Sequence, residues 1–457
     1  FGPGCSFGPQ DVARTPVVGE ASPRSSEMAS LADVLRKDVG GEERDALSSD
    51  STAEGLSRSS SEAQLSAPGT PPPSAAPAAL DPDRWYIHGQ SYDLGGFVNK
   101  HPGGRLAILS GRGRDCTALF ESYHPWNDHH RRVLKAFGPA PPAPDPFYEE
   151  LKAKLREAVP RGSKEAKMPW YVLLRLAVLW CVMAWLFFAA QTPLACAAAG
   201  FLMATVGTRL AHEGGHYQVS TKEWVNRLCL FLGYFLTGPS MAWHYRHVVS
   251  HHAHTNQESD ADVEYIGIAD RLPSWLKVLF LPILPMGAVF EIGPKSIADL
   301  LVFRKIGGDR VDWRVGGLLL EIPAWLLVHW FFGPPVVGYL CMWFVAGAVF
   351  VPCSQVAHAI LFPKVQEHAS WAKMQVAESC DFAADSEFWF HLAFGLTMQV
   401  EHHLFPGVGH HLYARIRPLV SQVCKKHGVP YTHVPAGQAF RALWRRWVWG
   451  ELMPLAA

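Results

Sequence analysis

The 457-residue sequence lacks several features that mark common classes of protein. Its 41 basic and 41 acidic residues cancel, so no charge excess indicates a nucleic-acid partner or a strongly anionic substrate. The 9 cysteines are scattered without a CxxC pair, and several fall in apolar runs. We therefore predict reduced thiols that act as small buried side chains rather than as redox or metal-binding groups.

The first 80 residues lack hydrophobic periodicity and are rich in Ser, Pro, Ala and acidic side chains. They end in a Pro/Ala tract around Pro71-Pro72-Pro73. Such a composition buries too little apolar surface to offset the entropy of ordering, so we predict that residues 1–80 are disordered. A plastid transit peptide is disfavoured because such peptides are poor in acidic residues, and Met28 is a candidate natural start.

Hydrophobic residues make up 49% of the chain and crowd into residues 169–361. Four stretches are apolar over about the 20 residues that a membrane-spanning helix needs. They cover Trp170–Ala190, Pro193–Leu210, Val315–Phe332 and Pro335–Ala357. Short turns join them in two pairs, so both termini and every long loop are expected on one side. Two further apolar runs, Trp224–Leu236 and Trp275–Phe290, are shorter or broken by proline and are expected at the membrane interface.

Basic residues support this topology. The short hairpin turns carry none, whereas the long-loop side carries many, which is typical of the cytosolic face of a membrane protein. These residues are Lys164, Lys167, Lys222, Arg227, Arg304, Lys305, Arg310 and Arg314. We predict a mainly α protein with four spans and a helical cap on the cytosolic side.

The first histidine motif is His212-Glu213-Gly214-Gly215-His216, which follows the second predicted span. It satisfies the HExxH pattern of zinc peptidases, in which the Glu acts as base. Two glycines inside a helix cost about 2 kcal/mol relative to alanines, so they predict instead that another element or ligand approaches closely. A catalytic zinc needs three protein ligands, and this chain offers many more histidines. An intramembrane metalloprotease is therefore the less favoured interpretation.

Further histidines follow in a second motif, at the end of the fourth span and near the C-terminus. His247 and His251 share a helix face, and His252 lies beside them. The surplus His244 and His254 are expected to support these ligands or to lie on the surface.

Together the motifs predict that eight imidazoles meet on one membrane face. They are His212, His216, His247, His251, His252, His358, His402 and His403. Eight such ligands suit two metal ions, and iron, zinc and copper all bind imidazole. Gln399 lies about one helical turn before His402 and His403, on nearly the same face.

A small domain is predicted over residues 83–140. Residues 86–94 alternate around a glycine turn as in a β-hairpin, and His101-Pro102-Gly103-Gly104 predicts a rigid turn. The stretch from Trp85 to His124 resembles a cytochrome b5 domain, of small α+β type. The resemblance implies that His101 and His124 bind haem b iron from opposite sides, which leaves no open position and suits electron transfer. Because zinc has no redox chemistry to match a haem donor, the eight-histidine centre is expected to hold two irons.

Residues 83–440 resemble front-end fatty acid desaturases, which carry a cytochrome b5 domain, three histidine boxes and Gln at the start of the third box. The matching third box is Gln399-Val400-Glu401-His402-His403-Leu404-Phe405-Pro406. The resemblance implies a diiron centre built on the eight histidines with Gln399, and O2 as co-substrate. It also implies electrons from NADH through cytochrome b5 reductase, and an endoplasmic-reticulum membrane location.

The second box, followed by Thr255-Asn256, resembles enzymes that introduce Δ5 or Δ4 bonds into C20 or C22 polyunsaturated chains carried as acyl-lipid or acyl-CoA. Three alternatives remain open: a sphingoid long-chain-base Δ8 desaturase, a b5-fused acyl hydroxylase, and a membrane-anchored haem carrier. We divide the chain into a disordered segment (1–80), the haem domain (83–140), a linker (141–168), the desaturase domain (169–445) and a tail (446–457).

Overall fold

The computed structural model describes residues 80–235, 238–257, 259–262, 272–280, 295–298, 305–306, 309–310, 318–361 and 370–452. The segment predicted to be disordered lies outside these ranges, apart from Leu80. The predicted apolar run Trp275–Phe290 is described only as far as residue 280. All statements below concern the described residues.

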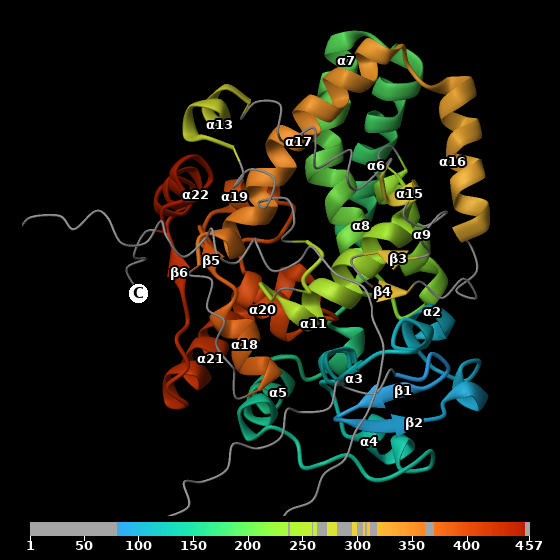
Figure 1. The fold of residues 1–457 in the computed structure, drawn as a ribbon, viewed down its shortest axis with the longest axis vertical. Helices are drawn as coiled ribbons and strands as arrows, with labels where there is room; N and C mark the ends of the chain where they lie inside the picture. Colours follow the sequence, from blue (N-terminus) through green and yellow to red (C-terminus); the bar gives the residue numbers. More distant parts are fainter. Residues whose placement is uncertain are drawn as a thin grey trace, which may run out of the picture. The chain divides into compact units, whose positions relative to one another are not determined.

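Residues 80–138 form the N-terminal module, with a two-stranded antiparallel sheet and short helices (Figure 1). The predicted hairpin is confirmed, because Ile87 pairs with Gln90 across a turn in which His88 and Gly89 both have positive φ. That backbone matches the twist of the two strands. Trp85, Ile87 and Tyr92 are buried in the module's core. The elements are β1 (Trp85–Ile87), β2 (Gln90–Tyr92), η1 (Gly95–Phe97), α2 (Gly104–Leu109), α3 (Thr117–Ser122) and α4 (His129–Leu134).

The segment that we expected to be a linker contains a packed helix, α5 (Pro146–Ala158), followed by η2 (Gly162–Lys164). Asp145 caps α5 by accepting a hydrogen bond from the Phe147 amide. Its apolar side chains, Tyr148 and Leu151 among them, enter the same core as Phe405 of the third box. The Tyr148 hydroxyl also donates to the Leu404 carbonyl at 2.7 Å. α5 therefore anchors this segment to the third box.

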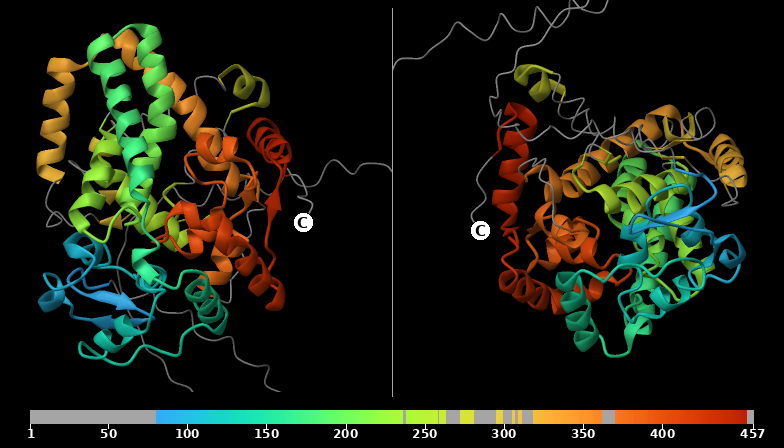
Figure 2. Two further views of the ribbon diagram at one scale, coloured as in Figure 1. Left: turned by 180° about the vertical axis from the view of Figure 1, so that it is seen from behind. Right: turned by 60° about the horizontal axis from the view of Figure 1, so that its bottom comes forward.

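Three long helices are sufficiently apolar and long to cross a membrane: Trp170–Ala190, Pro193–Gly215 and Val336–Ala359. The first consists of α6 (Trp170–Trp185) and the π-turn η3 (Leu186–Ala190). The second consists of α7 (Pro193–Leu202), the π-turn η4 (Met203–Gly207) and α8 (Thr208–Gly215), and the third is α17 (Val336–Ala359). α7 packs against both α6 and α17 (Figures 1 and 2). The second helix continues past the predicted end at Leu210, so His212 lies within the helix rather than after it.

The fourth predicted span corresponds to α16 (Leu318–Phe332), of which the structure describes 15 residues, fewer than the length that a span needs. Its exposed side chains are large and apolar, including Leu326, Trp330 and Phe331. Gly333 and Pro334 separate it from α17 as the sequence predicted. The four-span arrangement therefore stays a prediction.

The remaining elements form the cap, which carries the second and third histidine boxes (Figure 2). Its first part contains α9 (Glu223–Tyr234), α10 (Ser240–Trp243), the π-helix η5 (His244–His251), α11 (His252–His254), α13 (Ser274–Phe280), α15 (Ser296–Ala298), β3 (Lys305–Ile306) and β4 (Asp309–Arg310). Its second part contains α18 (Trp371–Ala377), β5 (Asp381–Phe382), α19 (Glu387–Leu392), α20 (Gln399–Leu404), η9 (His410–Leu412), α21 (Tyr413–Lys426), β6 (His433–Val434) and α22 (Ala436–Trp449). β5 and β6 pair in parallel, and α5, α20 and α21 share one apolar core.

Candidate metal centre

The eight histidines singled out in the sequence lie together and are all buried. His212 comes from α8 and His216 caps it, while His247 and His251 come from η5. His252 begins α11, His358 lies near the end of α17, and His402 and His403 lie on α20. A π-helical turn is rare and often marks a functional site, and here it supplies two members of the cluster.

The imidazoles fall into two main groups, within each of which the candidate ligand atoms lie within 4.8 Å of one another. The first group is His212, His216, His247 and His402, and the second is His251, His358 and His403. His252 forms a further group with His402 and His403, so it lies between the two. The adjacent residues His402 and His403 thus point to different groups.

The Nε2 atoms of several histidine rings face one another in this cluster. The Nε2 atoms of His212 and His247 are 3.2 Å apart, and those of His252 and His247 are 3.3 Å apart. His216 Nε2 and His402 Nε2 are buried and have no hydrogen-bond partner among the described residues. Imidazole nitrogens turned toward a common point fit metal ions at bonds of about 2 Å. The donor set therefore fits two imidazole-ligated ions.

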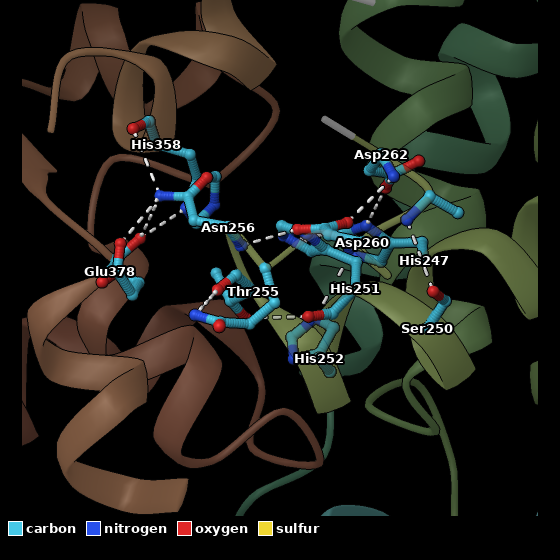
Figure 3. Close-up of polar contacts among 12 residues, drawn as sticks. His247, Ser250, His251, His252, Thr255, Asn256, Asp260, Asp262, His358 and Glu378 are labelled. Atoms are coloured by element: carbon cyan, nitrogen blue, oxygen red, sulfur yellow. Dashed lines mark hydrogen bonds and ion pairs between the residues drawn. The ribbon is translucent and has the colours of Figure 1, made fainter. Parts of the chain in front are cut away.

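The second nitrogen of most rings is held by a specific oxygen, which leaves Nε2 as the ligand atom. His247 Nδ1 donates to Asp262 and His251 Nδ1 donates to Asp260, each at 2.8 Å (Figure 3). The other contacts are His358 Nδ1 to the Glu378 carbonyl at 2.9 Å, His403 Nδ1 to Gln375 Oε1 at 2.7 Å, His402 Nδ1 to the Tyr413 hydroxyl at 3.2 Å, and His216 Nδ1 to the Tyr123 hydroxyl at 2.6 Å.

Electrostatics keep the two rings of the third box in their metal-binding form. Burial, together with neighbouring imidazoles, lowers the pKa of His402 and His403 well below the usual value, so both rings stay neutral. Burial alone would raise the pKa of Asp262, but the hydrogen bond from His247 and the charge of Arg246 lower it to about 2. Asp262 therefore remains a carboxylate that accepts the His247 proton.

The two glycines of the first box lie where other elements approach closely, as predicted. A Cβ atom on Gly214 would lie 2.7 Å from the Asn226 carbonyl, and one on Gly215 would lie 2.4 Å from the Trp243 ring. Any larger side chain would push α9 or Trp243 away from His212 and His216. Glu213, the base in a peptidase interpretation, instead pairs with buried Arg209 at 2.8 Å.

Gln399 lies with its amide against the second group. Its Nε2 is 3.0 Å from His358 Nε2 and 3.4 Å from His403 Nε2, and its Oε1 has no hydrogen-bond partner among the described residues. A ring nitrogen that binds metal has no lone pair left to accept a hydrogen bond, so metal binding favours turning Oε1 toward these rings.

A cavity of about 40 Å³ borders the cluster. Phe350, Phe394 and Leu396 line it together with His212, His247 and His358. A narrow apolar space beside the imidazoles suits a hydrocarbon segment and excludes bulk water.

A second, larger cavity of about 600 Å³ lies between the N-terminal module and the rest of the protein, and both predicted haem ligands line it. The ring centroids of His101 and His124 are 6.2 Å apart, which leaves room for two metal–nitrogen bonds of about 2 Å. His101 Nδ1 contacts the Gly104 carbonyl at 3.3 Å and His124 Nδ1 contacts the Phe120 carbonyl at 2.7 Å. Both rings therefore keep Nε2 for a metal, and the residues fit a bis-imidazole haem.

Several residues around the two histidine sites were not identified from the sequence. Asp260 and Asp262 follow the second box within ten residues, and that spacing was the available signal. The surplus His244 is buried and hydrogen-bonded to Ser110 of the N-terminal module at 2.9 Å, whereas His254 is exposed. His130 is buried and stacks on His124 with ring centroids 4.8 Å apart.

Comparison with known proteins agrees with this construction. The family model for fatty acid desaturases matches residues 185–435, and the model for the cytochrome b5-like haem/steroid binding domain matches residues 78–154.

Named relatives share most of their length with this chain. An acyl-lipid omega-13 desaturase of Chlamydomonas reinhardtii is 27% identical, over 76% of this chain and 88% of the relative. A chloroplastic acyl-lipid (7-3)-desaturase of the same organism is 30% identical, over 76% of each. An acyl-lipid (8-3)-desaturase of Physcomitrium patens is 27% identical, over 77% of this chain and 85% of the relative. Because the desaturase model and the cytochrome b5-like model both match, the chain belongs to the fatty acid desaturase family and is an oxidoreductase with a fused cytochrome b5-like domain.

Proposed function

We propose that this protein is a front-end desaturase of long-chain polyunsaturated acyl chains. It introduces a cis double bond between an existing one and the carboxyl end, at Δ5 or Δ4 of C20 or C22 chains. The observation that carries the proposal is the buried eight-histidine cluster against an apolar-walled cavity, in the same chain as a bis-histidine haem pocket. The names of the (8-3) and (7-3) relatives support an acyl chain esterified in a lipid as the substrate.

The residues have distinct roles in this reaction. Two bound iron ions supply the chemistry by which O2, with two electrons and two protons, removes two hydrogens from neighbouring methylenes and yields water. His212, His216, His247 and His402 hold one ion, and His251, His358 and His403 hold the other. His252 lies between them. Asp260 and Asp262 fix the rings of the second box through their Nδ1 protons.

Selectivity between chemically similar methylenes has to come from geometry, because only a fixed chain position presents one carbon pair to the irons. Phe350, Phe394 and Leu396 line the cavity beside the cluster and are suited to that positioning. His101 and His124 hold the haem that passes on electrons, and NADH–cytochrome b5 reductase is the proposed external donor. We place the protein in the endoplasmic-reticulum membrane with both metal sites on the cytosolic face.

Expression in yeast supplied with C18, C20 and C22 polyunsaturated acids tests this proposal. One product with a new double bond nearer the carboxyl end is expected, located by mass spectrometry of derivatised acyl chains in separated phospholipid and acyl-CoA fractions. A bond placed from the methyl end would instead match the relative named as an omega-13 desaturase. Desaturated sphingoid bases or hydroxylated chains would favour the alternatives and overturn the front-end assignment.

A further inference from the structure

Tyr123 connects the haem pocket with the eight-histidine cluster. It lies directly after α3 and immediately before the haem ligand His124, and it lines the haem cavity. Its hydroxyl is 2.6 Å from His216 Nδ1, and the two rings are within 14° of parallel. One side chain thus adjoins a haem ligand through the backbone and an iron ligand through a hydrogen bond.

The direction of this hydrogen bond follows from the role of His216. Its Nε2 is buried without a hydrogen-bond partner and belongs to the first metal group. The proton of the neutral ring is therefore on Nδ1, and His216 donates to the Tyr123 hydroxyl oxygen.

The surroundings of Tyr123 come from the histidine boxes themselves. Gly407, directly after the third box, lies beside the Tyr123 ring, and a Cβ there would be in ordinary van der Waals contact with it at 3.4 Å. Tyr217, directly after the first box, meets the same ring edge-on at 6.2 Å. The Ser110–His244 hydrogen bond adds a second polar contact between the module and the second box. Tyr123 is therefore held in place by the elements that carry the iron ligands.

We propose that Tyr123 is the positioning residue that couples haem to the iron centre and carries the electron path from His124 to His216. This inference rests on the proposed function. Electronic coupling decays less through covalent and hydrogen bonds than across a van der Waals gap. Each transfer moves one electron, which oxidises haem iron from ferrous to ferric and reduces one iron of the centre from ferric to ferrous. No bond breaks, and the hydroxyl keeps its proton.

Flash photoreduction of the purified full-length holoprotein tests the path without substrate or turnover. A deazaflavin flash under argon reduces the haem, and the decay of its absorbance reports transfer to the ferric centre. We expect Tyr123→Phe to slow this decay at least several-fold, because a through-space gap to His216 replaces the hydrogen bond. The haem spectrum, haem midpoint potential and iron content should match wild type, because His101, His124 and the iron ligands remain.

Tyr217→Phe is the matched control, because its buried hydroxyl has no hydrogen-bond partner among the described residues. Its decay should equal that of wild type. An unchanged decay in Tyr123→Phe, or equal slowing in both variants, would overturn the path. Loss of iron from Tyr123→Phe would instead assign the bond to metal binding. Absence of decay in wild-type protein, with iron present, would overturn the proposed function together with the path.

Discussion

The haem pocket and the iron centre both use histidine, but the protein builds them differently. The proposed haem ligands His101 and His124 come from one short stretch of chain, and each is oriented by a backbone carbonyl nearby in sequence. The eight histidines of the proposed iron centre come from four separate regions of the chain, and most are oriented by side chains or carbonyls of other elements. One site is nearly a local structure, and the other exists only in the complete fold.

The two sites also differ in the space around the ligands. The haem pocket is a cavity of about 600 Å³, which suits a large planar group. The iron centre borders only about 40 Å³, and its rings are packed against each other. The haem site therefore tolerates changes in its outer polar groups better than the iron centre, where each displaced ring disturbs its neighbours.

Removing one ligand from each site should separate them most clearly. His402→Ala deletes a ligand of the first iron group, so product is expected to fall to background while the haem absorbance spectrum stays unchanged. His101→Ala should abolish the haem spectrum but retain iron. Product analysis in yeast, haem spectroscopy and iron determination on the purified protein measure these outcomes.

His254→Ala is the control for this pair, because His254 follows the second box but is exposed. It should leave product, haem and iron unchanged. Loss of haem in His402→Ala would show that the two sites do not form independently, and that the haem site also depends on the complete fold.

The carboxylates that orient the second box are a further difference between the two sites, and changing one should have a smaller effect than removing a ligand. Asp262→Asn keeps the size of the side chain but removes the charge that accepts the His247 proton at 2.8 Å. We expect activity to fall roughly 10- to 100-fold, with weaker iron retention, because outer partners orient and polarise metal ligands. The haem pocket has no equivalent, since its ligands are held by backbone carbonyls.

Asp128→Asn serves as the comparison, because Asp128 is exposed and makes no capping hydrogen bond to α4. Its activity should be that of wild type. Full activity and full iron content in Asp262→Asn would mean that packing alone orients His247.

The contrast also explains how much the sequence predicted. The cytochrome b5-like domain, the hairpin and the close approach at Gly214 and Gly215 were foreseen, because each depends on neighbouring residues. The eight histidines were grouped correctly in space, since each box presents its rings in a local pattern.

The partners Tyr123, Gln375 and Tyr413 were missed because their roles depend on contacts between distant segments. The packed α5 was likewise taken as part of a linker, although Tyr148 and Leu151 place it in the core of the third box. A proline-rich segment before a helix resembles a linker in sequence, and only the structure shows that the apolar face of the helix is buried.

The last prediction concerns Glu121, a buried carboxylate that links several elements of the haem module. It accepts hydrogen bonds from His88, Arg131 and Lys152, which belong to the hairpin turn, α4 and α5. Burial alone would raise its pKa, but these partners lower it from 4.5 to about 2. That difference corresponds to about 3 kcal/mol of stability above pH 4.5. Because the pKa is lowered in the folded state, this contribution is lost as pH falls from 4.5 toward 2.

Glu121→Gln should therefore lower the free energy of unfolding of the haem module by about 3 kcal/mol at pH 7, and by less than half of that at pH 3. Guanidinium unfolding followed by haem absorbance measures the difference, with exposed Glu157→Gln as a control that changes little. The haem spectrum before unfolding should be unchanged, because no ligand is touched. An equal loss at both pH values would mean that Glu121 acts through packing, whereas an altered spectrum would show that the haem ligands depend on a distant carboxylate as the iron ligands do.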